Sequence, residues 1–498
     1  MIKIPHRLTA AIMLCSLGVT ALVTAADKPN IVYILADDLG YGDIQALNPE
    51  NGKIPTPHID QLAADGMVFS DAHTSSSVCT PSRYSILTGR YNWRSTLQAG
   101  VTWGFDAALI KEDRLTVAGF LREQGYTTAC IGKWHIGMDI PSKNGKPTVG
   151  RVPKEVNVDW TGAIKNGPVD VGFDYYWGLS ASLDMAPYAY IENRHFIKGE
   201  ALSEMRGRIL SAPGFSKEAA LGEICDKTVE FISEQSEDKP FFIYVPLTSP
   251  HTPILPTEAW RGKSGLNSVF ADFVMQTDAE VGKIIDAVDA AGFGENTIII
   301  FTADNGVSGA SKQGDLKKQG HLSSAQYRGM KKSIFEGGHR VPFIVRWPAG
   351  IEPKSQSDEA ICLTDLMATC ADLLAVELPD TAGEDSVSFF PAFSNKPIQS
   401  TRKGIVHHSY QGEFAYRSGK WKLLLTKVDS KRNSTDQLYD LEADPSERNN
   451  LHATHPEVVQ RLLTELQSDV ERGRSTAGPN LKNDVAEVKL WKNGKAIW

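Results

Sequence analysis

Residues 77–90 read Ser-Val-Cys-Thr-Pro-Ser-Arg-Tyr-Ser-Ile-Leu-Thr-Gly-Arg, and the rest of the chain is organised around this stretch. Pro81 suits the first position of a helix and Gly89 suits its end, so we expect a short helix with Cys79 just before it. The unpaired N–H groups at a helix start favour an anion or an oxyanion beside Cys79. Arg83, one turn further on, adds a positive charge. A half-buried cysteine before an ordinary capped helix explains these residues equally well.

Two blocks within this stretch resemble the signature of a known family. Cys-Thr-Pro-Ser-Arg at 79–83 and Leu-Thr-Gly-Arg at 87–90 are similar, at the same spacing, to the signature of the formylglycine-dependent sulfatases. These are the arylsulfatase-like, type I members of the alkaline phosphatase superfamily. The resemblance implies that a maturation enzyme oxidises Cys79 to formylglycine, an aldehyde whose hydrate is the nucleophile. It also implies sulfuric ester hydrolysis and an α/β/α sandwich fold.

Length and composition limit the architecture and the partners. A chain of 498 residues is too long for one ordinary core, so we expect a catalytic domain at 27–395 and a C-terminal subdomain at 396–498. The formal net charge of −8 argues against non-specific binding to nucleic acid. An anionic substrate must therefore be attracted by a local basic pocket.

The first 25 residues have the features of a signal peptide. A basic start is followed by the apolar run 8–23 and by Val-Thr-Ala at 23–25, a small-residue cleavage site. The apolar run is short for a membrane span, so we expect export to the periplasm or the medium. Five cysteines remain after cleavage, and the sequence leaves their disulfide pairing open. Cys130, in an apolar strand pattern, is expected to be a buried thiol.

Four apolar runs predict buried strands that each end beside polar groups. The runs are 30–35, 127–131, 241–245 and 297–302. The polar groups that follow them are Asp37 and Asp38, Lys133 and His135, His251, and Asp304 and Asn305. In an open α/β sheet, ligands bind at the carboxyl ends of the strands, so these groups are expected to form one site. Asp-Asp-Leu-Gly and Asp-Asn-Gly are also ordinary turn sequences.

Helical patterns between the strands predict an α/β fold with a mostly parallel sheet and helices on both faces. The expected helices are 59–67, 115–125, 217–235, 270–291 and 364–375, and a further strand is expected at 343–347. After residue 401 the pattern changes to short antiparallel strands at 405–408, 413–417, 421–426 and 437–440. With a closing helix at 456–472, these predict a small α+β subdomain.

Two further blocks extend the resemblance. Lys-Trp-His at 133–135 would place Lys133 and His135 on one face of an extended chain, and it is similar to the family's lysine-and-histidine motif. Glu-Gly-Gly at 336–338 resembles another block of the family. In the family a lysine stands five positions before this block, and in this sequence that position holds Lys331. The catalytic residues implied by the resemblance are Cys79, Arg83, Lys133, His135, His251 and Lys331.

The resemblance also implies a metal site formed by Asp37, Asp38, Asp304, Asn305 and residue 79. These side chains offer hard oxygen ligands, which suit one Ca²⁺, suit Mg²⁺ less well and do not suit Zn²⁺. By the same resemblance, Asp304 takes the proton of the attacking hydroxyl, and Lys331 and His251 bind the sulfate.

The substrate is less well determined by the sequence. The region 139–215 is poorly patterned and rich in aromatic residues, which suit sugar stacking and loop packing equally. Export and these aromatics favour a sulfated carbohydrate. The candidate substrate-binding residues are Trp103, Trp177, His321, His408 and Tyr410. Two other functions remain open: a phosphomonoester or phosphonate hydrolase on the same fold, and a glycan-binding protein with an unconverted Cys79.

Overall fold

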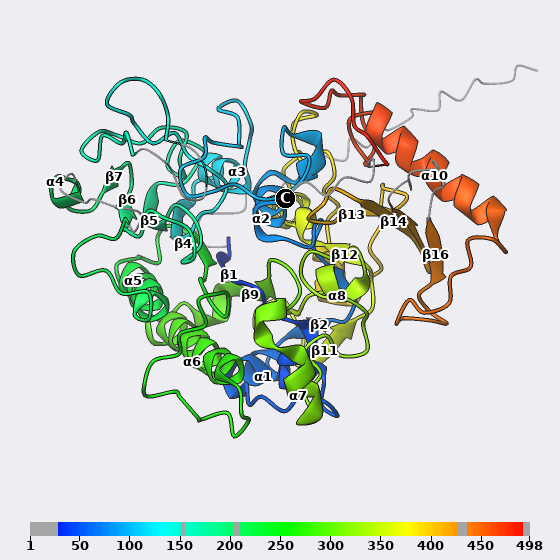
Figure 1. Ribbon diagram of the computed structural model, residues 1–498, viewed down its shortest axis with the longest axis horizontal. Helices are drawn as coiled ribbons and strands as arrows, with labels where there is room; N and C mark the ends of the chain where they lie inside the picture. Colours follow the sequence, from blue (N-terminus) through cyan, green and yellow to red (C-terminus); the bar gives the residue numbers. More distant parts are fainter. Residues whose placement is uncertain (1–27, 149, 151–155, 203–209, 427–435, 492–498) are drawn as a thin grey trace, which may run out of the picture.

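The computed structural model describes residues 28–148, 150, 156–202, 210–426 and 436–491. The predicted signal peptide therefore lies outside the described residues. A ten-stranded sheet forms the centre of the molecule, in the order β11-β2-β10-β9-β1-β8-β4-β5-β6-β7 (Figure 1). A two-stranded sheet pairs β3 (Ala72–His73) with β12 (Ile361–Cys362).

The middle of the large sheet contains the four strands predicted as buried. β1 (Asn30–Ala36) runs parallel to β8 (Phe241–Pro246) on one side and to β9 (Thr297–Ala303) on the other. β4 (Thr127–Lys133) is parallel to β8. Nearly every residue of these strands is buried, as expected for strands covered on both faces.

The edges of the sheet differ from the prediction in two places. β5 (Tyr175–Leu179) joins β4 in parallel although it lies in the region without a clear pattern. Met67, expected at the end of a helix, begins β2 (Met67–Phe69), which pairs with β10 (Phe343–Arg346). The helix prediction was wrong here because the chain passes tightly beside β10: a Cβ on Gly66 would lie 2.1 Å from the Val345 carbonyl oxygen. The remaining edge strands are β6 (Ile191–Glu192), β7 (His195–Phe196) and β11 (Ser355–Ser357).

Helices cover both faces of the sheet, which confirms the predicted layered α/β fold. The long helices are α1 (Pro57–Ala64), α3 (Val117–Glu123), α5 (Ala220–Ser233), α6 (Val269–Ala290) and α9 (Leu366–Leu373). In Figure 1, α5, α6 and α1 lie on one side of the central strands, and α3 lies on the other with α2 (Cys79–Thr88), the helix of the opening stretch. The short helices are α4 (Gly199–Leu202), α7 (Gln313–Lys318) and α8 (Glu336–His339). Within the described residues, no helix is both long and apolar enough to span a membrane.

The C-terminal region forms the predicted antiparallel sheet. Its strands are β13 (Ile405–His408), β14 (Phe414–Ser418), β15 (Trp421–Leu425) and β16 (Gln437–Asp440), paired in chain order. α10 (Pro456–Glu471) packs against this sheet through Leu462 and Leu466, which are fully buried. The four predicted strands and the closing helix are therefore confirmed.

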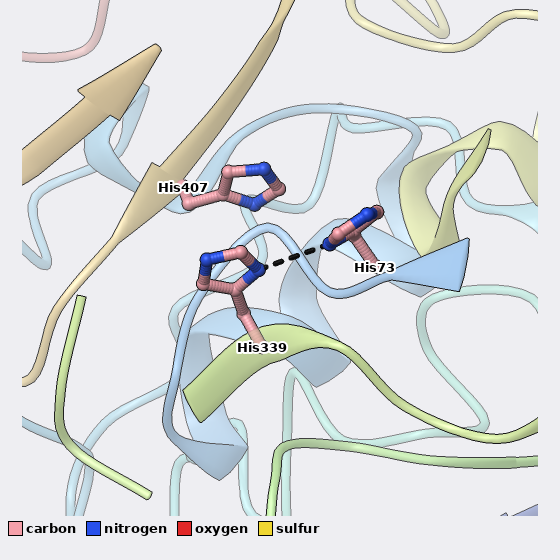
Figure 2. A group of neighbouring side chains, drawn as sticks. All are labelled: His73, His339 and His407. Carbon is pink, nitrogen blue, oxygen red and sulfur yellow. Dashed lines mark hydrogen bonds between the residues drawn. The ribbon is translucent and has the colours of Figure 1, made fainter. Parts of the chain in front are cut away.

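A buried histidine cluster, His73, His339 and His407, joins the C-terminal sheet to the rest of the molecule (Figure 2). His73 comes from β3, His339 from α8 and His407 from β13. The Nδ1 atoms of His73 and His339 are 3.1 Å apart, and the rings of His339 and His407 stack with centroids separated by 3.8 Å. Stacked neutral rings pack well, whereas a second charge among them would be repelled.

The hydrogen bonds around His73 and His339 assign their protons. Lys422 Nζ, a donor only, lies 2.9 Å from His339 Nε2, so the His339 hydrogen is on Nδ1 and is donated to His73 Nδ1. His73 Nε2 lies 2.7 Å from Asp71 Oδ1 and 2.8 Å from Arg417 Nη1, which pairs with the same carboxylate. Burial lowers the pKa of both rings, which favours their neutral forms. Three cations, Lys422, Arg340 and Arg417, face three carboxylates, Asp71, Glu336 and Glu447, so the cluster is balanced in charge.

The histidine cluster predicts that folding stability falls as the pH drops below about 6.5, the ordinary pKa of histidine. Burial lowers the pKa of all three rings, and a neighbouring ring of the cluster and the Lys422 ammonium lower those of His339 and His407 further. Below pH 6.5 the unfolded chain therefore binds more protons than the native one. Each ring contributes a loss of up to about 1.4 kcal/mol per pH unit. Urea unfolding at pH 7.5 and 5.5 measures the effect, with His195→Gln, an exposed site, as control. Equal stability at both pH values would contradict this account.

Replacing Lys422 by methionine is expected to destabilise the fold by about 3–5 kcal/mol. Lys422 Nζ donates to Glu336 Oε1 at 2.9 Å and to Glu447 Oε1 at 2.8 Å, and all three side chains are buried. Burial alone would raise the pKa of Glu336, but the Lys422 ammonium holds it well below its usual range. The variant leaves both carboxylates without this partner. Denaturant unfolding compares it with Lys420→Met, which removes a surface ion pair to Asp440 and is expected to leave the stability nearly unchanged.

Candidate active site

The predicted metal ligands lie side by side at the carboxyl edge of the central sheet. Ala36 and Ala303 are register partners, so Asp37 and Asp304 leave their strands at the same level. The Asp304 N–H donates to the Ala36 carbonyl oxygen at 3.0 Å. The Asp38 N–H donates to Asp304 Oδ1 at 3.2 Å, and Asn305 Nδ2 donates to Asp38 Oδ1 at 2.8 Å. Parallel pairing of β1 and β9 thus assembles four groups from distant parts of the chain.

α2 (Cys79–Thr88) directs its N-terminus at the same edge. The helix begins at Cys79 itself, two residues earlier than expected, because Val78 is extended and serves as the N-cap residue. Gly89 ends the helix with φ +62°, as the sequence predicts. Cys79 is only 2% exposed, and its sulfur and one oxygen each of Asp37 and Asp304 lie within 4.8 Å of one another.

Two buried cations pair with the inner carboxylates, Asp304 and Asp37. Arg83 donates to Asp304 Oδ2 from Nε at 2.9 Å and from Nη2 at 2.7 Å, and its Nη1 donates to the Lys133 carbonyl oxygen at 3.0 Å. Lys133 Nζ donates to Asp37 Oδ2 at 2.5 Å. Despite Arg83, burial and the neighbouring Asp37 carboxylate raise the pKa of Asp304 to about 7. Arg83 and Lys133 therefore do not fully offset the repulsion between the Asp37 and Asp304 carboxylates.

Lys331 reaches the site from a loop in which backbone segments pass so close together that two positions, Gly306 and Gly337, leave no room for a side chain. A Cβ on Gly306 would lie 2.0 Å from the Gly337 carbonyl oxygen, and one on Gly337 would lie 2.5 Å from the Gly329 carbonyl oxygen. This close approach holds the Lys331 N–H on the Val307 carbonyl oxygen at 2.9 Å. The Lys331 ammonium then lies 2.6 Å from Asp38 Oδ1.

Two histidines complete the site. His251 Nε2 lies 3.6 Å from Asp38 Oδ2, and its Nδ1 donates to the Thr252 carbonyl oxygen at 2.6 Å. His135 Nε2 donates to the Thr102 carbonyl oxygen at 2.9 Å, which leaves a lone pair on Nδ1. The expectation of an extended chain was wrong, because β4 continues to Lys133 and His135 is left-handed with φ +57°.

The donor set at this edge fits a hard divalent cation. Asp37 Oδ1, Asp38 Oδ2 and Asn305 Oδ1 are buried and accept no hydrogen bond from any described residue. Leaving a buried acceptor without a partner costs about 1–3 kcal/mol. Oxygen ligands of this kind are those that Ca²⁺ and Mg²⁺ prefer. Three carboxylates and the cations Arg83, Lys133 and Lys331 balance, so a divalent cation would in turn balance an anionic substrate and an ionised nucleophile.

A pocket of about 220 Å³ opens onto Cys79. Four of the residues that line it are site residues: Asp38, Cys79, His251 and Lys331. The other lining residues are Val78, Val101, Trp103, Asp184, Met185, Thr252, Ser308, Lys332 and Tyr410. This mixture of charged groups with aromatic and apolar groups suits a sugar ring that carries an anionic substituent.

Comparisons with known proteins agree with this geometry. The family model described as Sulfatase matches residues 29–376, and a second one, described as N-sulphoglucosamine sulphohydrolase, C-terminal, matches residues 329–475. The chain belongs to the sulfatase family. An N-acetylgalactosamine-6-O-sulfatase of Bacteroides thetaiotaomicron is 33% identical to this sulfatase, over 89% of the chain and 93% of the relative. Human arylsulfatase A is 29% identical, over 90% and 88%.

A solved structure supports the same assignment. Its title concerns the metabolism of multiple glycosaminoglycans by Bacteroides thetaiotaomicron, and it matches with a TM-score of 0.77 and 32% identity. The match covers 89% of this chain and 99% of the other. This sulfatase is therefore a sulfuric ester hydrolase with the fold that the sequence predicts.

Two of the five predicted substrate-binding residues, Trp103 and Tyr410, line the Cys79 pocket of the sulfatase. The other three lie elsewhere. Trp177 stacks on Tyr190 with ring centroids 4.2 Å apart, and His408 is buried against Phe414. His321 donates to Asp43 Oδ1 and accepts the Lys53 N–H, on the wall of a larger cavity of about 790 Å³.

That larger cavity is lined by α7 and the loop before Lys331, and it includes neither Cys79 nor any of the metal-ligand candidates. We therefore place the chemistry in the smaller pocket. Sequence reasoning missed Asp184, Met185 and Lys332 there. Lys332 directly follows a motif lysine, which was the one available signal, whereas Asp184 and Met185 lie in the poorly patterned region.

The cysteines in the described part of the sulfatase are free thiols. Cys79, Cys130, Cys225, Cys362 and Cys370 are all buried, and none forms a disulfide within the described part of the chain. The prediction of a buried Cys130 thiol is confirmed. No disulfide to one of the other four cysteines therefore competes with the oxidation of Cys79.

Proposed function

We propose that this sulfatase removes sulfate from a sulfated carbohydrate by means of a formylglycine made from Cys79 and a bound divalent cation, most suitably Ca²⁺. The observation that carries the proposal is the convergence of Cys79 with Asp37 and Asp304 at the start of a buried helix. The unpartnered oxygens of Asp37, Asp38 and Asn305 support the cation. The name of the N-acetylgalactosamine-6-O-sulfatase relative supports the carbohydrate.

In the first step the hydrated formylglycine attacks sulfur in line and the sugar hydroxyl leaves. The Cys79 sulfur marks the position of the hydrate oxygens. Asp37, Asp38, Asp304 and Asn305 would hold the cation, which would lower the pKa of the attacking hydroxyl and neutralise charge on the sulfate. Asp304 takes the proton of the attacking hydroxyl, and Lys331 and His251 bind the sulfate and protonate the leaving oxygen. Because the Nδ1 hydrogen of His251 is donated to the Thr252 carbonyl oxygen, His251 gives a proton from Nε2 only as the imidazolium.

In the second step the sulfated hydrate collapses. His135 accepts the proton of the remaining hydroxyl, the carbonyl forms again and the bond to sulfate breaks. The hydrogen bond from His135 Nε2 to the Thr102 carbonyl oxygen supports this role, because it leaves Nδ1 as the free acceptor. Burial, Lys133 and Arg83 lower the pKa of His135 well below its usual value, so the ring is neutral and can take a proton. Arg83 and Lys133 stabilise the hydrate.

The predicted signal peptide at residues 1–25 supports export, which would put this chemistry outside the cytoplasm. Production therefore requires export and a formylglycine-generating enzyme. The proposal is tested by producing the chain with that enzyme, measuring sulfate release from a panel of sulfated glycans, and determining residue 79 by peptide mass spectrometry. We expect an aldehyde at position 79 and turnover of at least one glycan. An intact thiol in fully active protein, or activity confined to small aryl sulfates, would contradict the proposal.

A further inference from the structure

Lys332 occupies the mouth of the Cys79 pocket in an unusual backbone conformation. Its φ of +77° lies in the left-handed region that residues with a Cβ seldom adopt. Two backbone hydrogen bonds hold it there: the Lys332 N–H donates to the Ser77 carbonyl oxygen at 2.8 Å, and the Tyr410 N–H donates to the Lys332 carbonyl oxygen at 3.3 Å. The segment before Cys79 and the C-terminal region therefore both fix this exposed lysine at the pocket.

The charge of Lys332 is not used by the inner site. Arg83, Lys133 and Lys331 already pair with Asp304, Asp37 and Asp38. Lys332, in contrast, makes no ion pair with any described residue.

The Lys332 ammonium instead lies 5.0 Å from the centre of the Tyr410 ring, a cation–π contact that uses none of its hydrogen-bond donors. Asp184, which also lines the pocket, interacts with Lys217. The ammonium at the mouth is thus available to a ligand.

We propose that Lys332 is a specificity-determining residue that binds a second anionic group of the substrate. This inference rests on the proposed function. With the reacting sulfate at Cys79 and Lys331, the sugar ring lies along Trp103 and Tyr410, and Lys332 meets a substituent at the outer end of that ring or on the next sugar. The preferred substrate is then a carbohydrate with two anionic groups.

The second anion has two chemical sources: the carboxylate of an adjoining uronic acid, or a second sulfate on the same sugar. An ammonium binds both, because it acts as a point charge with three donors. The contact is made equally in the bound substrate and in the transition state. It is therefore expected to act on KM and to leave kcat nearly unchanged.

The test compares Lys332→Met and Lys332→Arg with the matched control Lys317→Met, an exposed lysine of α7 outside the Cys79 pocket. For the first source, the probes are a sulfated disaccharide with a free uronic acid and its methyl ester. For the second, they are a disulfated and a monosulfated monosaccharide. 4-Nitrophenyl sulfate, which has one anionic group, reports the basal reaction.

We expect Lys332→Met to raise KM about tenfold for the dianionic member of at least one pair and to leave its monoanionic partner and 4-nitrophenyl sulfate unchanged. Lys332→Arg should restore most of the loss, and the effect should shrink with added salt. Equal effects on both members of each pair, or no effect on any, would overturn the role of Lys332 while the proposed function stands. If the wild-type enzyme releases sulfate from no carbohydrate, the proposed function fails and this inference with it.

Discussion

Replacing Cys79 by alanine is expected to lower kcat/KM for sulfate release by about 10⁵-fold or more, as does the loss of a covalent nucleophile in other hydrolases. The remaining groups still bind the sulfate ester, but alanine provides neither an attacking oxygen nor a second hydroxyl to expel sulfate. The fold should tolerate the change, since Cys79 is a small buried residue in no disulfide. Sulfate release by purified variant and wild type, with matched thermal unfolding curves, measures the effect.

Cys79→Ser is the informative control. A serine hydroxyl left unoxidised can attack sulfur once, but the resulting sulfate ester has no neighbouring hydroxyl on the same carbon to drive elimination. We expect one equivalent of alcohol to be released in a burst and very slow sulfate release after it. If the alanine variant keeps wild-type turnover, residue 79 is not the nucleophile.

Removing the divalent cation is expected to abolish turnover and to lower the stability of the native state. A ligand present at 100 times its dissociation constant stabilises the fold by about 2.7 kcal/mol, so a chelator should lower the Tm of the wild type. Asp38→Asn removes one charge from the ligand set, and its activity is expected to fall about 10³-fold. Its Tm should respond far less to the chelator, because less cation is bound at the start. Metal analysis of the purified protein identifies the ion.

The matched control for this prediction is Asp43→Asn. Asp43 is also a fully buried carboxylate on the segment after β1, but it accepts hydrogen bonds from His321 Nε2 and from the Gly40 N–H and does not face the other ligands. Its loss can lower the Tm, yet the shift caused by the chelator should remain. If Asp38→Asn shows the same chelator-induced shift as the wild type, the cation is bound elsewhere.

The sequence by itself determined the strands at the centre of the sheet and predicted which polar groups lie at its carboxyl edge. Apolar, β-branched runs such as Asn30–Ala36 favour buried strands, and the polar residues directly after them are expected at the carboxyl edge of a parallel sheet. Local turn chemistry likewise predicted the end of α2 at Gly89. These features depend on neighbours along the chain, which a sequence displays directly.

Only the tertiary structure decided the features that depend on partners far away in the chain. Asp37, Asp38 and Asn305, each with a buried oxygen that accepts no hydrogen bond from a described residue, lie at one edge because β1 and β9 pair in one register. β5 is a strand because β4 offers it an edge, and Met67 leaves its expected helix because the backbone passes so close to Val345. Lys332 lies at the pocket because Ser77 and Tyr410 hold its backbone in place. No local pattern encodes such contacts, since hundreds of residues can separate the groups that make them.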